Sequence, residues 1–126
     1  QTLTPAFSGL IKQNVEFCSA LVASKDSHIR PSLLPHSVYM VPEEKLQEVK
    51  LAYDEALSGS HVVIHTHLNE TKKEIDDLLS KTGKSAIQSL DSLGLLNSRT
   101  VAAHCVHMTD EEIKLMAERK GNVAHC

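Results

Sequence analysis

The chain has 126 residues, of which 41% are hydrophobic and 23% charged, and its formal net charge is −3. This length suits one domain with a buried core, while the negative charge and the scarcity of aromatic residues exclude a basic or stacking surface for nucleic acid. No apolar run approaches the roughly 18 residues of a membrane-spanning helix, and three widely spaced cysteines predict no disulfide framework, so we expect a protein of the reducing cytoplasm.

Apolar periodicity and its punctuation divide the chain into alternating helices and strands. Helical spacing of apolar residues, with Thr4 as the expected N-cap and Pro5 at the first helical position, predicts the first helix. Runs of β-branched residues predict buried parallel strands. The predicted helices cover residues 4–24, 42–58, 70–81, 85–93 and 110–120, and the predicted strands cover residues 30–36, 61–66, 99–105 and 122–126.

The alternation of these elements predicts an α/β fold. Strands separated by helices require crossover connections, and crossovers give a parallel sheet. The chain opens without an initiator Met and stops inside an apolar, strand-like segment. We therefore expect residues 1–126 to be the middle fragment of a larger domain, truncated at both ends.

Histidines follow the predicted strands. The segment HVVIHTHLNE places His65 and His67 at the end of one strand, and the other three strands end near His36, His104 and His125. The carboxyl ends of parallel strands share one rim, where α/β proteins build their sites. Four strands that each finish in histidine are difficult to explain by packing alone.

Imidazole at such a rim suits two kinds of chemistry. It ligates zinc or iron, and it exchanges protons near neutral pH. Glu70, three residues after His67, is either a ligand or general acid/base, or a first-turn glutamate stabilised by the helix dipole. His65 and His67 share one face of an extended strand, but a zinc site needs three or four ligands, and the chain has no CxxC or HExxH motif.

Other candidate residues have simpler interpretations. We expect His28 and His61 to face solvent, and His107 either to line the loop after the third strand or to face water. Cys105 is interpreted as a small buried strand residue rather than a nucleophile. Residues 81–85, KTGKS, lack the upstream glycine of a phosphate-binding loop and predict a turn.

Four segments, taken in order, resemble one known family. They are LPHSVYMVPEEKL, VVIHTHLNETKKEI, TVAAHCVHMTDEEI and GNVAHC. They resemble strands four to seven of the amidohydrolase superfamily, in the branch of S-adenosylhomocysteine/5′-methylthioadenosine deaminases, guanine deaminase and triazine chlorohydrolases. The resemblance covers nearly all of the chain past residue 30.

This resemblance implies a partial (β/α)8 TIM barrel with four consecutive βα units. It implies hydrolytic deamination of a purine-like or other small N-heterocyclic substrate by a water that zinc, iron or manganese activates. His67 corresponds to a metal ligand, and Glu70 to the residue that contacts the ring nitrogen and shuttles protons. His104 corresponds to a residue beside the reacting water and substrate, and His36 to one that contacts substrate. We assign no such role to His65.

The chain also departs from the family pattern. The strand-one HxH pair and the strand-eight Asp are absent, so we expect the isolated chain to bind no metal tightly and to be inactive. A half barrel exposes two long strand edges, which predicts homo-oligomers or association through those edges. Two alternatives stay open: a triazine-type chlorohydrolase, and a small α/β binding domain without catalysis.

Overall fold

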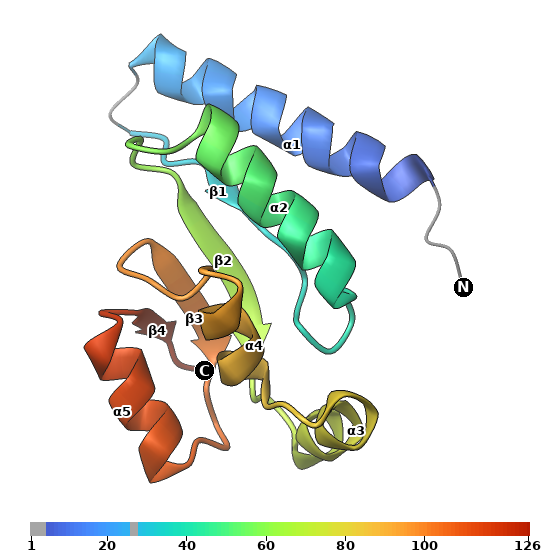
Figure 1. Cartoon of the computed structure of the whole chain (residues 1–126). Coiled ribbons are helices and arrows are strands. Elements are labelled where there is room, and N and C mark those ends of the chain that lie inside the picture. The colour runs from blue at the N-terminus through green and yellow to red at the C-terminus, as the bar shows by residue number, and fades with distance from the viewer. Residues whose placement is uncertain (1–4, 26–27) are drawn as a thin grey trace.

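The structure is a computed structural model that describes residues 5–25 and 28–126, and Figure 1 shows the arrangement of its elements. Helix α1 begins at the predicted Pro5, whereas the predicted cap, Thr4, lies outside the described residues. The helices are α1 (Pro5–Ser24), α2 (Glu43–Ala56), α3 (Lys72–Thr82), α4 (Ala86–Ser92) and α5 (Asp110–Glu118), and the strands are β1 (Ser32–Leu33), β2 (Val63–Leu68), β3 (Thr100–His104) and β4 (Asn122–Ala124).

The strands form one parallel sheet in the order β1-β2-β3-β4 (Figure 1). Helix α2 joins β1 to β2, helices α3 and α4 join β2 to β3, and α5 joins β3 to β4. This confirms the predicted parallel α/β fold, because helical crossovers join each strand to the next and give three βα units followed by strand β4. The register sets Leu68 opposite His104, so β2 and β3 end together at one rim.

Two strand boundaries differ from the prediction in a way that affects the rim. Strand β2 is shifted by two residues relative to the predicted 61–66, so His67 lies inside the strand and not after it. Of residues 30–36, only Ser32 and Leu33 form strand β1, because the flanking prolines lack the N–H that a ladder needs. His36 follows the strand, yet its carbonyl oxygen still accepts a 3.0 Å hydrogen bond from the backbone N–H of His67.

The prediction of two long, exposed strand edges is wrong. The outer strands β1 and β4 contain two and three residues, so each edge offers few backbone groups to another chain. Short edge strands are a common way to limit edge-to-edge association. Association through these edges stays a prediction.

One face of the sheet is buried and the other is half-open. In strand β2 the side chains of Ile64, Thr66 and Leu68 are buried, whereas the alternate residues are only partly covered. Ile64 and Leu68 pack with Leu46 of α2 and Leu90 of α4 in one hydrophobic core. The partly covered face therefore carries His65 and His67, as the spacing of two predicted.

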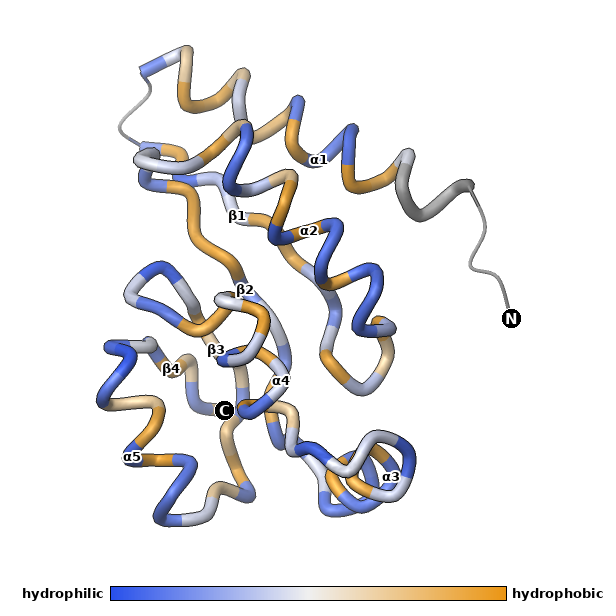
Figure 2. Tube along the Cα trace, in the orientation of Figure 1, coloured by the Kyte–Doolittle hydropathy of each residue, from blue (hydrophilic) through white to orange (hydrophobic). Residues whose placement is uncertain are grey.

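Helices α1 and α2 pack against each other beside strand β1 (Figure 1). Hydrophobic and hydrophilic residues alternate along both helices (Figure 2), which is the pattern of a helix with one buried side. Helix α1 is the longest helix, with 20 residues. Within residues 5–25 and 28–126, no helix is both long and apolar enough to cross a membrane.

Helix α4 offers a direct test of the predicted helix starts. The Ser85 side chain accepts a hydrogen bond from the Gln88 backbone N–H, and the Gln88 side chain accepts one from the Ser85 N–H. We expect Ser85→Ala to lower the free energy of unfolding by about 1 kcal/mol, and Ser85→Gly by only a few tenths. Urea denaturation followed by circular dichroism measures both. Ser80→Ala, at an exposed position within α3, is the control and should not destabilise the chain, since alanine favours helix more than serine.

Candidate active site

Three histidine rings form a stack along the rim. The ring centroids of His36 and His67 are 4.6 Å apart, and those of His67 and His104 are 5.5 Å apart, with interplanar angles of 28° and 20°. A fourth histidine joins the row from the end of β4, because Nδ1 of His125 lies 2.7 Å from the carbonyl oxygen of His104. The structure therefore brings together the four strand-end histidines that the sequence placed on one rim.

The backbone of His36 fixes the orientation of the His67 ring. Nδ1 of His67 lies 2.6 Å from the carbonyl oxygen of His36. A carbonyl oxygen can only accept, so Nδ1 carries the hydrogen and Nε2 keeps its lone pair. A ring held in this way by a backbone carbonyl is the arrangement of a histidine that ligates a metal through Nε2.

Glu70 faces His104 across the rim. Its Oε2 atom lies 3.7 Å from Nε2 of His104. Glu70 precedes Thr71, which is the N-cap of α3, and the acidic residue of the first turn is Glu74. Glu70 is therefore not the first-turn glutamate of the alternative interpretation. Its side chain is about half exposed, so the carboxyl group can reach a ligand at the rim.

The strand ends that carry these groups adopt left-handed backbone conformations. The φ angles are +51° at Asn69, +76° at His104 and +52° at Cys105. Each such residue other than glycine costs about 1–3 kcal/mol, and it keeps this conformation only where its surroundings hold it. Here the Cys105 N–H donates to the carbonyl oxygen of Leu68 at 2.8 Å, so the second strand end supports the turn of the third.

A pocket of about 260 Å³ opens beside the stack. The turn after His36 lines this pocket, and within the turn the buried Ser37 accepts at its Oγ a 3.1 Å hydrogen bond from the Met40 N–H. Tyr39 and Met40 of the same turn also line the pocket. The lining residues are His36, Ser37, Tyr39, Met40, His67, Glu70, Thr71, Lys73 and Glu74.

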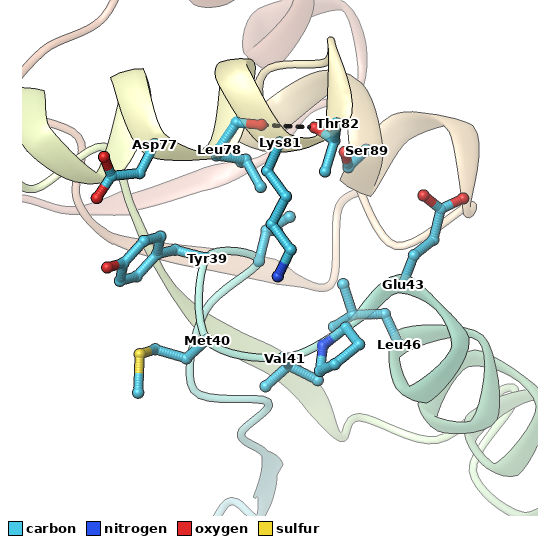
Figure 3. A pocket seen from close by; sticks show the side chains of 12 residues that line it. Tyr39, Met40, Val41, Glu43, Leu46, Asp77, Leu78, Lys81, Thr82 and Ser89 are labelled. Carbon is cyan, nitrogen blue, oxygen red and sulfur yellow. Dashed lines mark hydrogen bonds between the residues drawn. The ribbon is translucent and has the colours of Figure 1, made fainter. Parts of the chain in front are cut away.

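A second and larger pocket, of about 460 Å³, is lined by the same turn and by residues of helices α2, α3 and α4 (Figure 3). Tyr39 and Met40 line both pockets. In Figure 3 the Lys81 side chain extends from α3 toward Val41, and Thr82 donates its hydroxyl hydrogen to the Leu78 carbonyl oxygen at 2.8 Å. This pocket contains none of the rim histidines, so we place the candidate active site at the smaller one.

The remaining histidines lie outside the stack. His28 is exposed as expected, whereas His61 is only partly exposed to solvent. His107 is half-buried, and its carbonyl oxygen accepts a hydrogen bond from the Asn69 side chain at 3.1 Å, which favours the loop-lining alternative. His65 shares a face with His67 but is not part of the ring stack.

Cys105 lies directly after strand β3, and its thiol is not activated. Burial, and to a lesser extent the nearby Glu112 carboxylate, raise the pKa of the Cys105 thiol to about 11. A nucleophilic cysteine requires a thiolate at neutral pH, so the nucleophile alternative is not supported.

We expect iodoacetamide to modify exposed Cys126 much faster than Cys105 at pH 8, and the Cys105 rate to rise steeply as the pH approaches 11. Peptide mass spectrometry measures both rates. Equal rates for the two thiols at pH 8 would contradict this result.

The raised pKa of Cys105 also predicts a loss of stability in alkali. Between about pH 9 and 11 the thiol loses its proton in the unfolded chain but keeps it in the folded chain. The free energy of unfolding is therefore unaffected by this thiol below pH 9 and falls as the pH rises from 9 to 11.

Two organising residues were not assigned their roles from the sequence. Ser37 lines the smaller pocket and holds its turn through Met40, and Asn69 bonds across the rim to the segment after β3. Thr71 caps α3 through a capping box with Glu74. The sequence offered one signal for the role of Asn69, namely an asparagine directly after a strand. Asparagine is enriched among residues with positive φ.

The chain is similar to known proteins in sequence and in fold. The model of the Amidohydrolase family matches residues 7–126. The 5′-deoxyadenosine deaminase of Methanothrix thermoacetophila is 42% identical over 101 residues, which cover 80% of this chain and 24% of that protein.

Solved structures resemble the fold closely. The crystal structure of an adenosine deaminase from Xanthomonas campestris with bound zinc has a TM-score of 0.76 and 31% identity, covering 88% of this chain and 25% of that one. The guanine deaminase from C. acetobutylicum has a TM-score of 0.82 at 24% identity, covering 98% and 29%. The chain thus spans about a quarter of the length of the proteins it matches. With a family match over nearly its whole length, the chain belongs to the amidohydrolase family.

Proposed function

We propose that this chain contributes four consecutive βα units to the barrel of a metal-dependent aminohydrolase that deaminates a purine-like N-heterocycle. The observation that carries the proposal is the arrangement at the rim. Glu70 faces His104 at 3.7 Å, beside a His67 ring whose Nδ1 is engaged by a backbone carbonyl. The relatives named as 5′-deoxyadenosine deaminases support the substrate class.

His67 fits one position in the coordination shell of a divalent ion such as zinc. Its Nδ1 hydrogen is bonded to His36, which leaves Nε2 as the donor atom that zinc prefers from histidine. In the described part of the chain, no group of three or more His, Cys, Asp or Glu side chains could hold an ion. The remaining ligands must then come from other segments. When bound, such an ion supplies a water acidic enough to act as the nucleophile near neutral pH.

The other rim residues act on the substrate. Glu70 takes a proton from the attacking water and donates it to the ring nitrogen next to the reacting carbon, and it then carries the remaining hydroxyl proton to the leaving amine. His104, within 3.7 Å of that carboxylate, orients the nucleophile and the developing tetrahedral centre. His36 is exposed at the pocket and offers its ring to the substrate.

A chimera tests the proposal. The 101 matched residues of this chain replace the corresponding segment of the Methanothrix thermoacetophila 5′-deoxyadenosine deaminase, to which they are 42% identical. We expect the chimera to keep bound zinc and to release ammonia from 5′-deoxyadenosine, adenosine or guanine. A folded chimera with the zinc content of the parent enzyme that releases ammonia from none of these would overturn the proposed function.

A further inference from the structure

The side chain of Asn69 is buried between the ends of strands β2 and β3. Only 3% of the residue is exposed. Its Nδ2 group donates to the carbonyl oxygen of His107 and to Oε2 of Glu112, both at 3.1 Å, and lies 3.3 Å from the sulfur of Met108. This amide therefore has its acceptors on the segment after β3 and on helix α5, about forty residues further along the chain.

The backbone of Asn69 makes a second set of contacts with the same segment. Its carbonyl oxygen accepts hydrogen bonds from the N–H groups of Val106 and His107, each at 3.1 Å. Its φ angle of +51° turns the chain sharply out of β2. Residue 69 thus fastens the turn after β2 to the turn after β3 through both main chain and side chain.

Glu70 is the next residue in the chain, and His104 stands immediately before the fastened segment. Within the described residues, the charged partner of the Glu70 carboxylate is the His104 ring, whose Nε2 lies 3.7 Å away. The separation of these two groups therefore depends on how the two turns are held together. Glu112 links Asn69 to helix α5, because its Oε2 atom accepts one hydrogen bond from the Asn69 amide and another, at 3.0 Å, from the Thr109 N–H at the start of α5.

We propose that Asn69 is a positioning residue, which with Glu112 holds Glu70 opposite His104. The importance of that placement for catalysis rests on the proposed function, but the placement itself does not. A displacement of about 1 Å at a reacting group can lower a rate on the order of 100-fold.

Variants at residue 69 separate the side chain from the backbone. Asn69→Gly keeps a left-handed conformation available and removes only the amide. Asn69→Asp keeps the size but sets a carboxylate against Glu112, and the two charges repel. In the double variant Asn69→Asp/Glu112→Gln, the new amide can donate to the new carboxylate and restore one hydrogen bond with reversed polarity.

The measurement is nuclear magnetic resonance of the 126-residue chain. The nuclear Overhauser contact between the Glu70 side chain and the His104 ring reports their separation. We expect this contact to be lost in Asn69→Gly and Asn69→Asp and to return in the double variant. Amide hydrogen exchange at Val106 and His107 should rise by roughly 10-fold in the single variants, as expected when one or two hydrogen bonds are lost.

A matched control removes a comparable hydrogen bond elsewhere. Gln88→Ala breaks the capping box of α4 without touching the rim, so it should lower stability and leave the Glu70–His104 contact intact. If the contact persists in both Asn69 variants, the proposal is overturned and Asn69 only stabilises the turn. If neither variant folds, Glu112→Ala decides in the same way, because it removes one acceptor of the amide and leaves residue 69 unchanged.

Enzyme activity is not needed for this result. A chimera that is inactive while the Glu70–His104 contact follows the pattern above would overturn the proposed function and leave the positioning role standing. An active chimera, together with a Glu70–His104 contact that the Asn69 variants do not change, would support the proposed function and overturn the positioning role.

Discussion

Replacing Glu70 with glutamine in the chimeric deaminase should lower kcat by roughly 100- to 10,000-fold, the range typical for loss of a general acid/base. Glutamine keeps the size and hydrogen-bonding capacity of the side chain but cannot exchange a proton at the ring nitrogen. The Glu70 carboxyl group is half-exposed at the pocket and 3.7 Å from His104, so its main interaction in the reaction is with the substrate. We therefore expect KM to change much less than kcat.

Steady-state release of ammonia measures both constants. The control is Glu111→Gln, an exposed acidic residue in the first turn of α5, which should leave kcat within about 2-fold since it is remote from the rim. A Glu70→Gln chimera with nearly full kcat would remove Glu70 from the proton-transfer role. It would leave the metal site of the proposal untouched.

His67→Ala should have the second large effect, on metal content rather than on proton transfer. The substitution removes the Nε2 donor and both ring contacts of the stack, with His36 and with His104. Mutation of a residue that only orients a metal ligand already lowers metal affinity typically 10- to 100-fold. We expect the zinc affinity of the chimera to fall at least to the upper end of that range, on the order of 100-fold, with activity falling in parallel.

Zinc content after dialysis and competition with a zinc-binding dye provide the measurement. His61→Asn is the matched control, because His61 lies just before the opposite end of strand β2 and contributes nothing to the rim. Equal zinc content in the His67→Ala and His61→Asn chimeras would show that His67 is not a ligand. Excess zinc that restores activity to His67→Ala but not to Glu70→Gln would separate the two roles.

The sequence predicted the order of elements and the composition of the rim. Its helices and strands are short, strongly patterned and bounded by capping residues, so local interactions determine most of their boundaries. Ser85, Thr71 and Thr109 each begin a helix with a complete capping box. Parallel strands then bring their carboxyl ends to one rim, which is why histidines far apart in sequence could be assigned to one site.

The errors arise where local pattern and tertiary pairing differ. Residues 61–66 looked like the strand because they are β-branched, but pairing with β3 carries strand β2 on to Leu68. The stretch 30–36 looked like a strand throughout, yet only Ser32 and Leu33 pair with β2. Strand propensity describes a side chain that fits a sheet, whereas the neighbouring strand decides where the ladder begins and ends.

The amino-acid sequence alone thus determined that this chain is α/β, that its four strand-end histidines gather with Glu70 at one rim, and that the pattern is that of an amidohydrolase. Only the tertiary structure decided which nitrogen of His67 is open, because the Nδ1 partner is a backbone carbonyl of His36, 31 residues earlier. It also decided that Asn69 bonds across to Glu112, 43 residues further along the chain. Both outcomes depend on the register between neighbouring strands, which long-range packing sets and no local run of residues specifies.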